Sequence, residues 1–141
     1  MAKVKQIFAL FLLWRGFLLL PLLVGFLFLP YRAGSPYTNL WGFIQPYSPV
    51  DNFFLFPWAN FDGVHYLSIA GDGYPADGTN SRFFPLFPLL IRAVSEIFGA
   101  GAPFGLGYFL SGLFLSNFFL FLSLVIFYKL LRLDYSAKTS L

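Results

Sequence analysis

The sequence predicts an all-α integral membrane protein, in which two transmembrane helices flank a long non-cytoplasmic loop with short juxtamembrane helices. Three observations predict this class: 58% of the 141 residues are hydrophobic, only 11% are charged, and the mean hydropathy is +0.73. Soluble domains carry about 25% charged residues, so the composition argues against one. The formal net charge of +3 is too small and too scattered to indicate nucleic-acid binding. The absence of cysteine excludes disulfides and thiolate metal sites.

The first predicted transmembrane helix covers residues 7–29, which as a helix would be roughly 35 Å long and would cross a hydrocarbon core of about 30 Å. Lys3 and Lys5 precede it and place the N-terminus on the cytoplasmic side. The alternative is a cleaved signal peptide, whose apolar region would be shorter, about 7–15 residues. We expect Arg15, inside this stretch, to snorkel toward the cytoplasmic face; the alternative is a pairing with another helix or a lipid phosphate.

The second predicted transmembrane helix covers residues 104–128, and a cytoplasmic tail, residues 129–141, follows with three basic residues. Small residues allow helices to approach closely in membranes, so we expect this helix to have helical partners. The small residues are Gly105, Gly107, Ser111, Gly112, Ser116 and Ser123.

A third apolar stretch, residues 83–98, is ambiguous. A helix over residues 85–98 would be roughly 21 Å long, too short to cross, with Pro85 and Pro88 in its first turn. Arg92 and Glu96 are four residues apart on one of its faces. If this stretch did cross, the basic residues after the second span would fall outside. We therefore predict two spans, both termini in the cytoplasm, and a juxtamembrane helix here.

The predicted outer loop, residues 30–103, is rich in proline and aromatic residues, which is typical of a segment at the headgroup region. Within it, residues 61–71 predict a short helix with Asn60 as N-cap and Gly71 as its stop. Asp62 would lie in the first turn, where the helix dipole favours a carboxylate, and His65 would share its face.

Two interpretations of Asp62 stay open: a charge that stabilises the helix terminus, or a general base or metal ligand at a membrane-facing site. His65 either orients Asp62 or satisfies the fold. Two residues do not establish a metal site, so the metal ligands are unknown and a divalent cation remains an alternative to no cofactor. Asp51, Asp72 and Asp77 are the other acidic residues available, but turn chemistry explains Asp72 and Asp77 equally well.

Residues 60–74 and 82–92 together resemble the PIG-V-like mannosyltransferases, integral-membrane glycosyltransferases of the GT-C class. The similarity comprises an aromatic-Asp step at Phe61-Asp62, a Leu-Ser-Ile-Ala run, a Gly-Tyr turn and a Phe-Phe-Pro-x-x-Pro-Leu block, in that order. Leu115-Ser116-Asn117 in the second span also fits the family. Many members have Trp where this chain has Phe61. The resemblance covers almost the whole chain, but only about the N-terminal third of a typical member.

The resemblance implies an enzyme that takes a sugar from a polyprenyl-phosphate donor on the non-cytoplasmic face. Asp62 matches the acidic residue that acts on the acceptor hydroxyl, and we add His65 as its catalytic neighbour. Arg82 and Arg92 are the expected cations for the departing lipid phosphate, and Trp58 is a further expected substrate contact. The implied partners are the bilayer, the lipid-linked donor, and the remaining transmembrane helices of a longer protein or a membrane partner. The alternative function is a non-catalytic membrane module or accessory subunit derived from this family.

Overall fold

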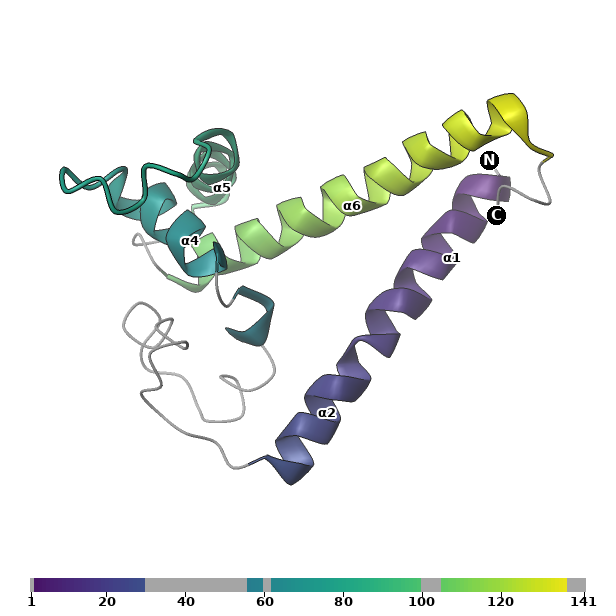
Figure 1. Cartoon of the computed structure of the whole chain (residues 1–141), viewed down its shortest axis with the longest axis horizontal. Coiled ribbons are helices and arrows are strands. Elements are labelled where there is room, and N and C mark those ends of the chain that lie inside the picture. The colour runs from purple at the N-terminus through teal and green to yellow at the C-terminus, as the bar shows by residue number, and fades with distance from the viewer. Residues whose placement is uncertain (1, 30–55, 60–61, 100–104, 137–141) are drawn as a thin grey trace. The chain divides into compact units, whose positions relative to one another are not determined.

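The computed structural model describes residues 2–29, 56–59, 62–99 and 105–136, and all regular elements in these ranges are helices. The chain divides into two compact units, residues 1–29 with 116–141 and residues 30–115, and the boundary falls within the last helix. Much of the expected aromatic loop, residues 30–55, lies outside the described residues. The helices in chain order are α1 (Ala2–Phe17), α2 (Leu19–Phe28), the 3₁₀ helix η2 (Phe56–Ala59), α4 (Asp62–Asp72), α5 (Leu86–Ile97) and α6 (Leu106–Asp134) (Figure 1).

The first predicted span is confirmed as an apolar helical stretch of membrane-spanning length, Lys3–Phe28, but it starts earlier than expected and is interrupted at Leu18. Pro21 explains the interruption, because proline has no N–H and its ring excludes the carbonyl four residues earlier, that of Phe17. The Leu18 N–H still donates to the Trp14 carbonyl over 3.1 Å, so the chain continues in nearly the same helical path.

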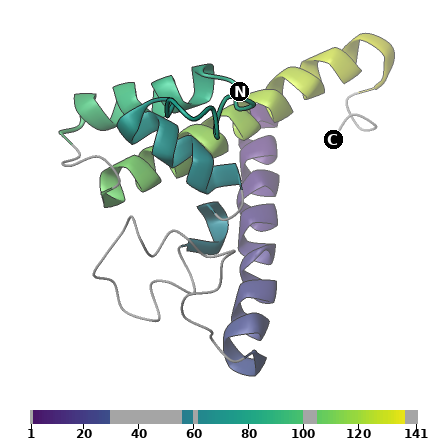
Figure 2. The same ribbon diagram turned by 60° about the vertical axis from the view of Figure 1, so that its left-hand side comes forward.

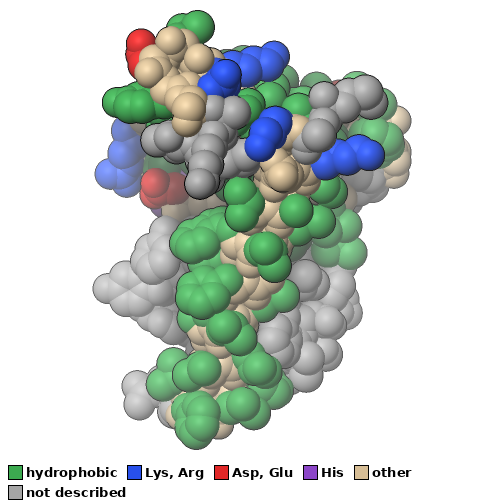
Figure 3. Space-filling view, turned by 90° about the vertical axis from the view of Figure 1, so that its right-hand side faces the viewer, with side chains coloured by type: hydrophobic (Ala, Val, Ile, Leu, Met, Phe, Trp, Pro, Cys, Tyr) green, Lys and Arg blue, Asp and Glu red, His purple; other side chains and the backbone are tan. Residues whose placement is uncertain are grey.

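The side chains of α1 and α2 are mostly exposed although they are mostly apolar. Only 11% of the apolar stretch is buried within the protein, and α2 has no buried residue. Figure 3 shows hydrophobic side chains along the length of this helical stretch. Arg15 lies over the ring of Phe11, one turn toward the N-terminus, with 5.6 Å between guanidinium carbon and ring centroid. These two helices have the composition that a bilayer, rather than water, accommodates.

The second predicted span is part of α6, which is also long and apolar enough to cross a membrane. It extends to Asp134, beyond the expected end at Tyr128, so Lys129 and Arg132 belong to the helix. Basic residues are good helix formers and interact favourably with a helix C-terminus, which explains the extension. Nη1 of Arg132 donates to the Tyr135 carbonyl over 2.6 Å, just past the last turn.

The unit formed by residues 30–115 has a compact core, in which α4 and α5 pack on the N-terminal part of α6 (Figures 1 and 2). Ile91 and Phe109 are each only 1% exposed. Gly112 makes the close approach possible: a Cβ there would lie 3.4 Å from Cδ1 of Ile91 and 4.0 Å from Cδ2 of Leu67. The expectation of helical partners is thus confirmed at Gly112. The buried core residues are Leu67, Ala70, Ile91, Tyr108, Phe109 and Leu115.

The two short helices appear close to their predicted bounds. Pro85 is the N-cap residue of α5, and Gly99, with φ of +60°, follows its C-terminus. In α4, Gly71 was predicted to end the helix. This prediction is wrong, because α4 continues to Asp72. Gly73 takes the left-handed conformation instead, with φ of +82°, and its N–H donates to the Ile69 carbonyl. A glycine two residues later therefore serves the same purpose.

Candidate functional site

Asp62 opens α4 and lies in its first turn, as predicted. Its side chain is exposed, and its carboxylate accepts no hydrogen bond from the residues that the structure describes. The expected N-cap, Asn60, and its neighbour Phe61 lie outside those residues. An exposed carboxylate in the first turn of a helix interacts favourably with the helix dipole and is open to an incoming hydroxyl or cation.

His65, one turn further along α4, is held from two directions. Its Nδ1 lies 2.9 Å from Oδ1 of Asn80. Its ring also stacks on that of Phe83, with centroids 4.7 Å apart and an angle of 21° between the planes. Among the described residues, the hydrogen-bond partner of His65 is therefore Asn80 rather than Asp62. The imidazole is fixed in place although it is only half-buried.

Asn80 is a site residue that the sequence analysis missed. Its side chain is 5% exposed, and a series of tight turns delivers it to α4. In these turns Gly78 N–H donates to the Pro75 carbonyl over 3.1 Å, and Phe83 N–H donates to the Asn80 carbonyl over 3.0 Å. No sequence signal distinguishes it, because an asparagine in a turn-rich segment is expected to serve the turn itself.

Phe83 contacts two of the predicted site residues, His65 and Arg82. Besides stacking on His65, its ring meets the edge of Tyr66 at 5.3 Å between centroids, and the guanidinium carbon of Arg82 lies 5.7 Å from its centroid. The Tyr74 hydroxyl donates to the Phe83 carbonyl. Arg82 is exposed at the surface and lies at the same aromatic ring as His65. The residues around Phe83 therefore include a cation.

Arg92 and Trp58 are placed differently. Nε of Arg92 donates to Oε1 of Glu96 over 2.8 Å, and this ion pair on the exposed side of α5 raises the pKa of the Arg92 guanidinium. Arg92 and Glu96, which the sequence places four residues apart on one helix face, are thus paired in the structure. Trp58 is half-buried in η2, which contacts α4.

The described residues contain no group of three or more His, Cys, Asp and Glu side chains that could hold a metal ion. Asp51 lies outside them. Asp77 serves a turn, because its Oδ1 accepts the Thr79 N–H over 2.9 Å. Hydrogen bonds from the side chain and backbone of Thr79 lower the pKa of Asp77. Turn chemistry thus accounts for Asp77.

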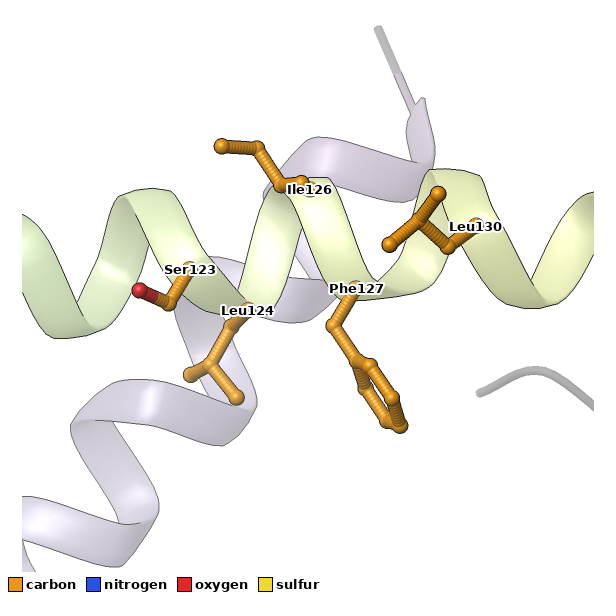
Figure 4. Close-up of a pocket in the computed structure, with 5 residues that line it drawn as sticks. All are labelled: Ser123, Leu124, Ile126, Phe127 and Leu130. Atoms are coloured by element: carbon orange, nitrogen blue, oxygen red, sulfur yellow. The ribbon is translucent and has the colours of Figure 1, made fainter.

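An open apolar pocket on α6 holds none of the predicted site residues (Figure 4). Figure 4 shows Leu124 and Phe127 directed to one side of the helix and Ile126 to the other, and Ser123 contributes the one hydroxyl group of the lining. Without an ionisable group, this lining offers no acid–base chemistry. The lining residues are Ser123, Leu124, Ile126, Phe127 and Leu130.

Comparisons of the chain with protein-family models, curated proteins and solved structures give no match. The assignment of function therefore depends on the residues and their geometry. The structure brings together an imidazole fixed by Asn80 and an arginine at the same ring of Phe83, and the exposed Asp62 lies one turn before His65 on α4.

Proposed function

We propose that this chain belongs to a membrane glycosyltransferase that moves a hexose from a polyprenyl-phosphate donor to a lipid, glycan or protein acceptor on the non-cytoplasmic face. The resemblance to PIG-V-like mannosyltransferases suggests mannose as the sugar. One observation carries the proposal: Asp62 is an exposed carboxylate in the first turn of α4, and α4 packs on the start of a membrane-length helix.

The packing of α4 supports a site at headgroup depth. Leu67 and Ala70 of α4 share a core with Tyr108 and Phe109, which lie in the first turn of α6. The carboxylate of Asp62 is therefore carried by a helix attached to one end of an apolar helix of spanning length. A lipid-linked donor has its tail in the bilayer and its phosphate at the surface, so its sugar would be reached from such a position.

The proposed reaction is a displacement at the anomeric carbon. The acceptor hydroxyl attacks this carbon, the bond from carbon to the phosphate oxygen breaks, and the polyprenyl phosphate leaves with the electron pair. Asp62 takes the proton of the attacking hydroxyl as general base. Arg82 neutralises charge on the leaving phosphate, and His65, Trp58 and Arg92 are proposed to contact substrate. We assign no cofactor to this reaction.

The substitution Asp62→Asn tests this proposal in the full-length protein, supplied with a polyprenyl-phosphate hexose and assayed for sugar transfer. Asparagine keeps the shape and can still serve the helix terminus, but it cannot take a proton. General-base assistance is worth about 10²–10⁴-fold in rate, so we expect turnover to fall by that order. Asp72→Asn, at the other end of the same helix and also exposed, is the matched control and should transfer sugar at the parent rate. Parent-like turnover by Asp62→Asn would contradict the proposal.

The proposal also places both termini in the cytoplasm and residues 30–103 outside. The chain has no cysteine, so single cysteines report their side without a background. We expect Thr79→Cys and Ser136→Cys, both at exposed positions, to react with a membrane-impermeant maleimide from opposite sides of intact membranes. Labelling of both from the same side would exclude the two-span arrangement.

A further inference from the structure

The carboxamide of Asn80 is a buried polar group to which the proposed reaction gives no role. At 5% exposure Asn80 is shielded from water, and an amide buried without a hydrogen-bond partner destabilises the folded state. Its partner is His65, fifteen residues earlier in the chain, at 2.9 Å between Oδ1 and Nδ1. The turns that precede Phe83 thus bring a buried acceptor to one particular nitrogen of the chain's single histidine.

We infer that Asn80 is a positioning residue that fixes the neutral His65 ring in its Nδ1–H tautomer and so makes Nε2 the nitrogen that accepts a hydrogen bond from a substrate hydroxyl. A carboxamide oxygen only accepts, so Nδ1 must donate. Neutral imidazole has a single N–H, and the lone pair therefore lies on Nε2. No described residue hydrogen-bonds Nε2. The contact of Nε2 with a substrate hydroxyl rests on the proposed function, whereas the Nδ1–H tautomer does not.

The stacking on Phe83 makes this assignment specific. A half-turn of the imidazole about its bond to Cβ would keep the ring plane, and hence the stack, but would replace Nδ1–H by a C–H at the Asn80 oxygen. The hydrogen bond therefore selects one of two ring orientations that the stack alone would accept. Neutral histidine in water favours the Nε2–H form, so the tautomer in this protein depends on Asn80.

Because the chain has one histidine, its tautomer can be measured without assignment of the spectrum. We would label the protein with ¹⁵N-histidine and record long-range ¹H–¹⁵N correlations in detergent micelles at alkaline pH, where the ring is neutral. In the parent, Nδ1 should be the protonated nitrogen and Nε2 the unprotonated one. A parent ring protonated at Nε2 would overturn the inference outright, and this outcome requires no variant.

Three variants sharpen the test. Asn80→Ala should move the proton to Nε2, whereas Asn80→Asp keeps an acceptor oxygen and should retain the parent tautomer. Ser81→Ala, at the exposed position that follows Asn80, is the control and should also retain it. If Asn80→Ala keeps Nδ1–H, the stack alone sets the ring and the inference is wrong. If Asn80→Ala does not fold, Asn80→Asp decides: loss of Nδ1–H in this variant would equally overturn it.

A double-mutant cycle in the sugar-transfer assay tests whether Asn80 affects turnover through His65. Asn80→Ala alone should lower turnover about tenfold, the effect expected from the loss of roughly one hydrogen bond. In a His65→Ala background the same substitution should cost nothing further, because Asn80 acts through the imidazole. Additive losses would contradict the positioning role. If Asp62→Asn transfers sugar at the parent rate while the tautomer result holds, the proposed function fails and the role of Asn80 in fixing the ring stands.

Discussion

The core built by α4, α5 and the start of α6 and the apolar helices of residues 1–29 use the same side chains in opposite ways. Phe109 in the core is 1% exposed, whereas Phe28 at the end of α2 is 77% exposed. In the core, apolar residues meet other parts of the protein. Along α1 and α2 they face outward over most of the length. The difference shows that two kinds of apolar surface are present, one that protein covers and one suited to lipid.

The pattern of the residues distinguishes the two kinds. In α5 the buried positions Pro88, Ile91 and Ser95 recur on one face, and the charged pair of Arg92 and Glu96 lies outside it. In α2 apolar residues surround the helix, which is typical of a helix in a membrane or in the centre of a large protein. Since α2 has no buried residue, the first explanation fits.

The largest effect that separates the two kinds of surface is expected within α5. Ile91→Ala removes a side chain that is 1% exposed and should lower the free energy of unfolding by about 2–5 kcal/mol. Ile97→Ala, the same change in the same helix at a side chain that is 77% exposed, should change it by less than about 0.5 kcal/mol. Denaturant titration in micelles, followed by tryptophan fluorescence, measures both. Equal losses would show that α5 is not packed as described.

A second comparison uses two helical glycines, one from each region. A Cβ on Gly112 would already lie 3.4 Å from Ile91, whereas nothing lies within 4 Å of a Cβ on Gly16. Gly112→Leu should therefore overpack the core and cost about 1–3 kcal/mol. Gly112→Ala keeps ordinary contact distances and should be neutral or stabilising by up to about 1 kcal/mol. Gly16→Leu is the matched control. The yield of folded protein in detergent should fall for Gly112→Leu and stay unchanged for Gly16→Leu. A lower yield for Gly16→Leu than for Gly112→Leu would contradict the packing around Gly112.

The sequence predicted the α-helices well because each leaves a strong local signal, whereas the 3₁₀ helix η2 was not predicted. The two apolar stretches are long, and Pro85 marks the start of α5 as Asp62 marks that of α4. The errors are at the helix ends and at Leu18, where the first predicted helix is interrupted. The choice between Gly71 and Gly73 depends on which glycine takes a positive φ, which is set by the turn that follows. The C-terminus of α6 was placed at the end of the apolar run, although helix formation does not require apolar residues.

The candidate site was predicted in part. Asp62 and His65 were predicted to lie one turn apart on one short helix, as the structure has them. Arg82 was predicted as a cation for the leaving phosphate, which stays a prediction, and the structure places its guanidinium at the Phe83 ring. Neither the Asn80 partner nor the stacking on Phe83 could be predicted, because both depend on how a turn-rich segment folds back on α4. Such contacts follow from tertiary packing, which residue spacing does not encode.

The smallest expected effect concerns Asp77, in the turns that deliver Asn80 to the core. Hydrogen bonds from Thr79 lower the pKa of Asp77 below its ordinary value of 3.8. A carboxyl whose pKa is lower in the folded state stabilises that state above the unfolded pKa, about 3.9, and this stabilisation is lost as pH falls through the folded pKa. The gap in melting temperature between the parent and Asp77→Asn should therefore be constant near neutral pH and shrink below about pH 4.

Thr79→Ala removes the side-chain donor and should raise the NMR titration midpoint of the Asp77 carboxyl toward its ordinary value. Because Asp77 is exposed, the change in stability should be small, and a midpoint unmoved by Thr79→Ala would show that the hydroxyl of Thr79 does not hold this turn.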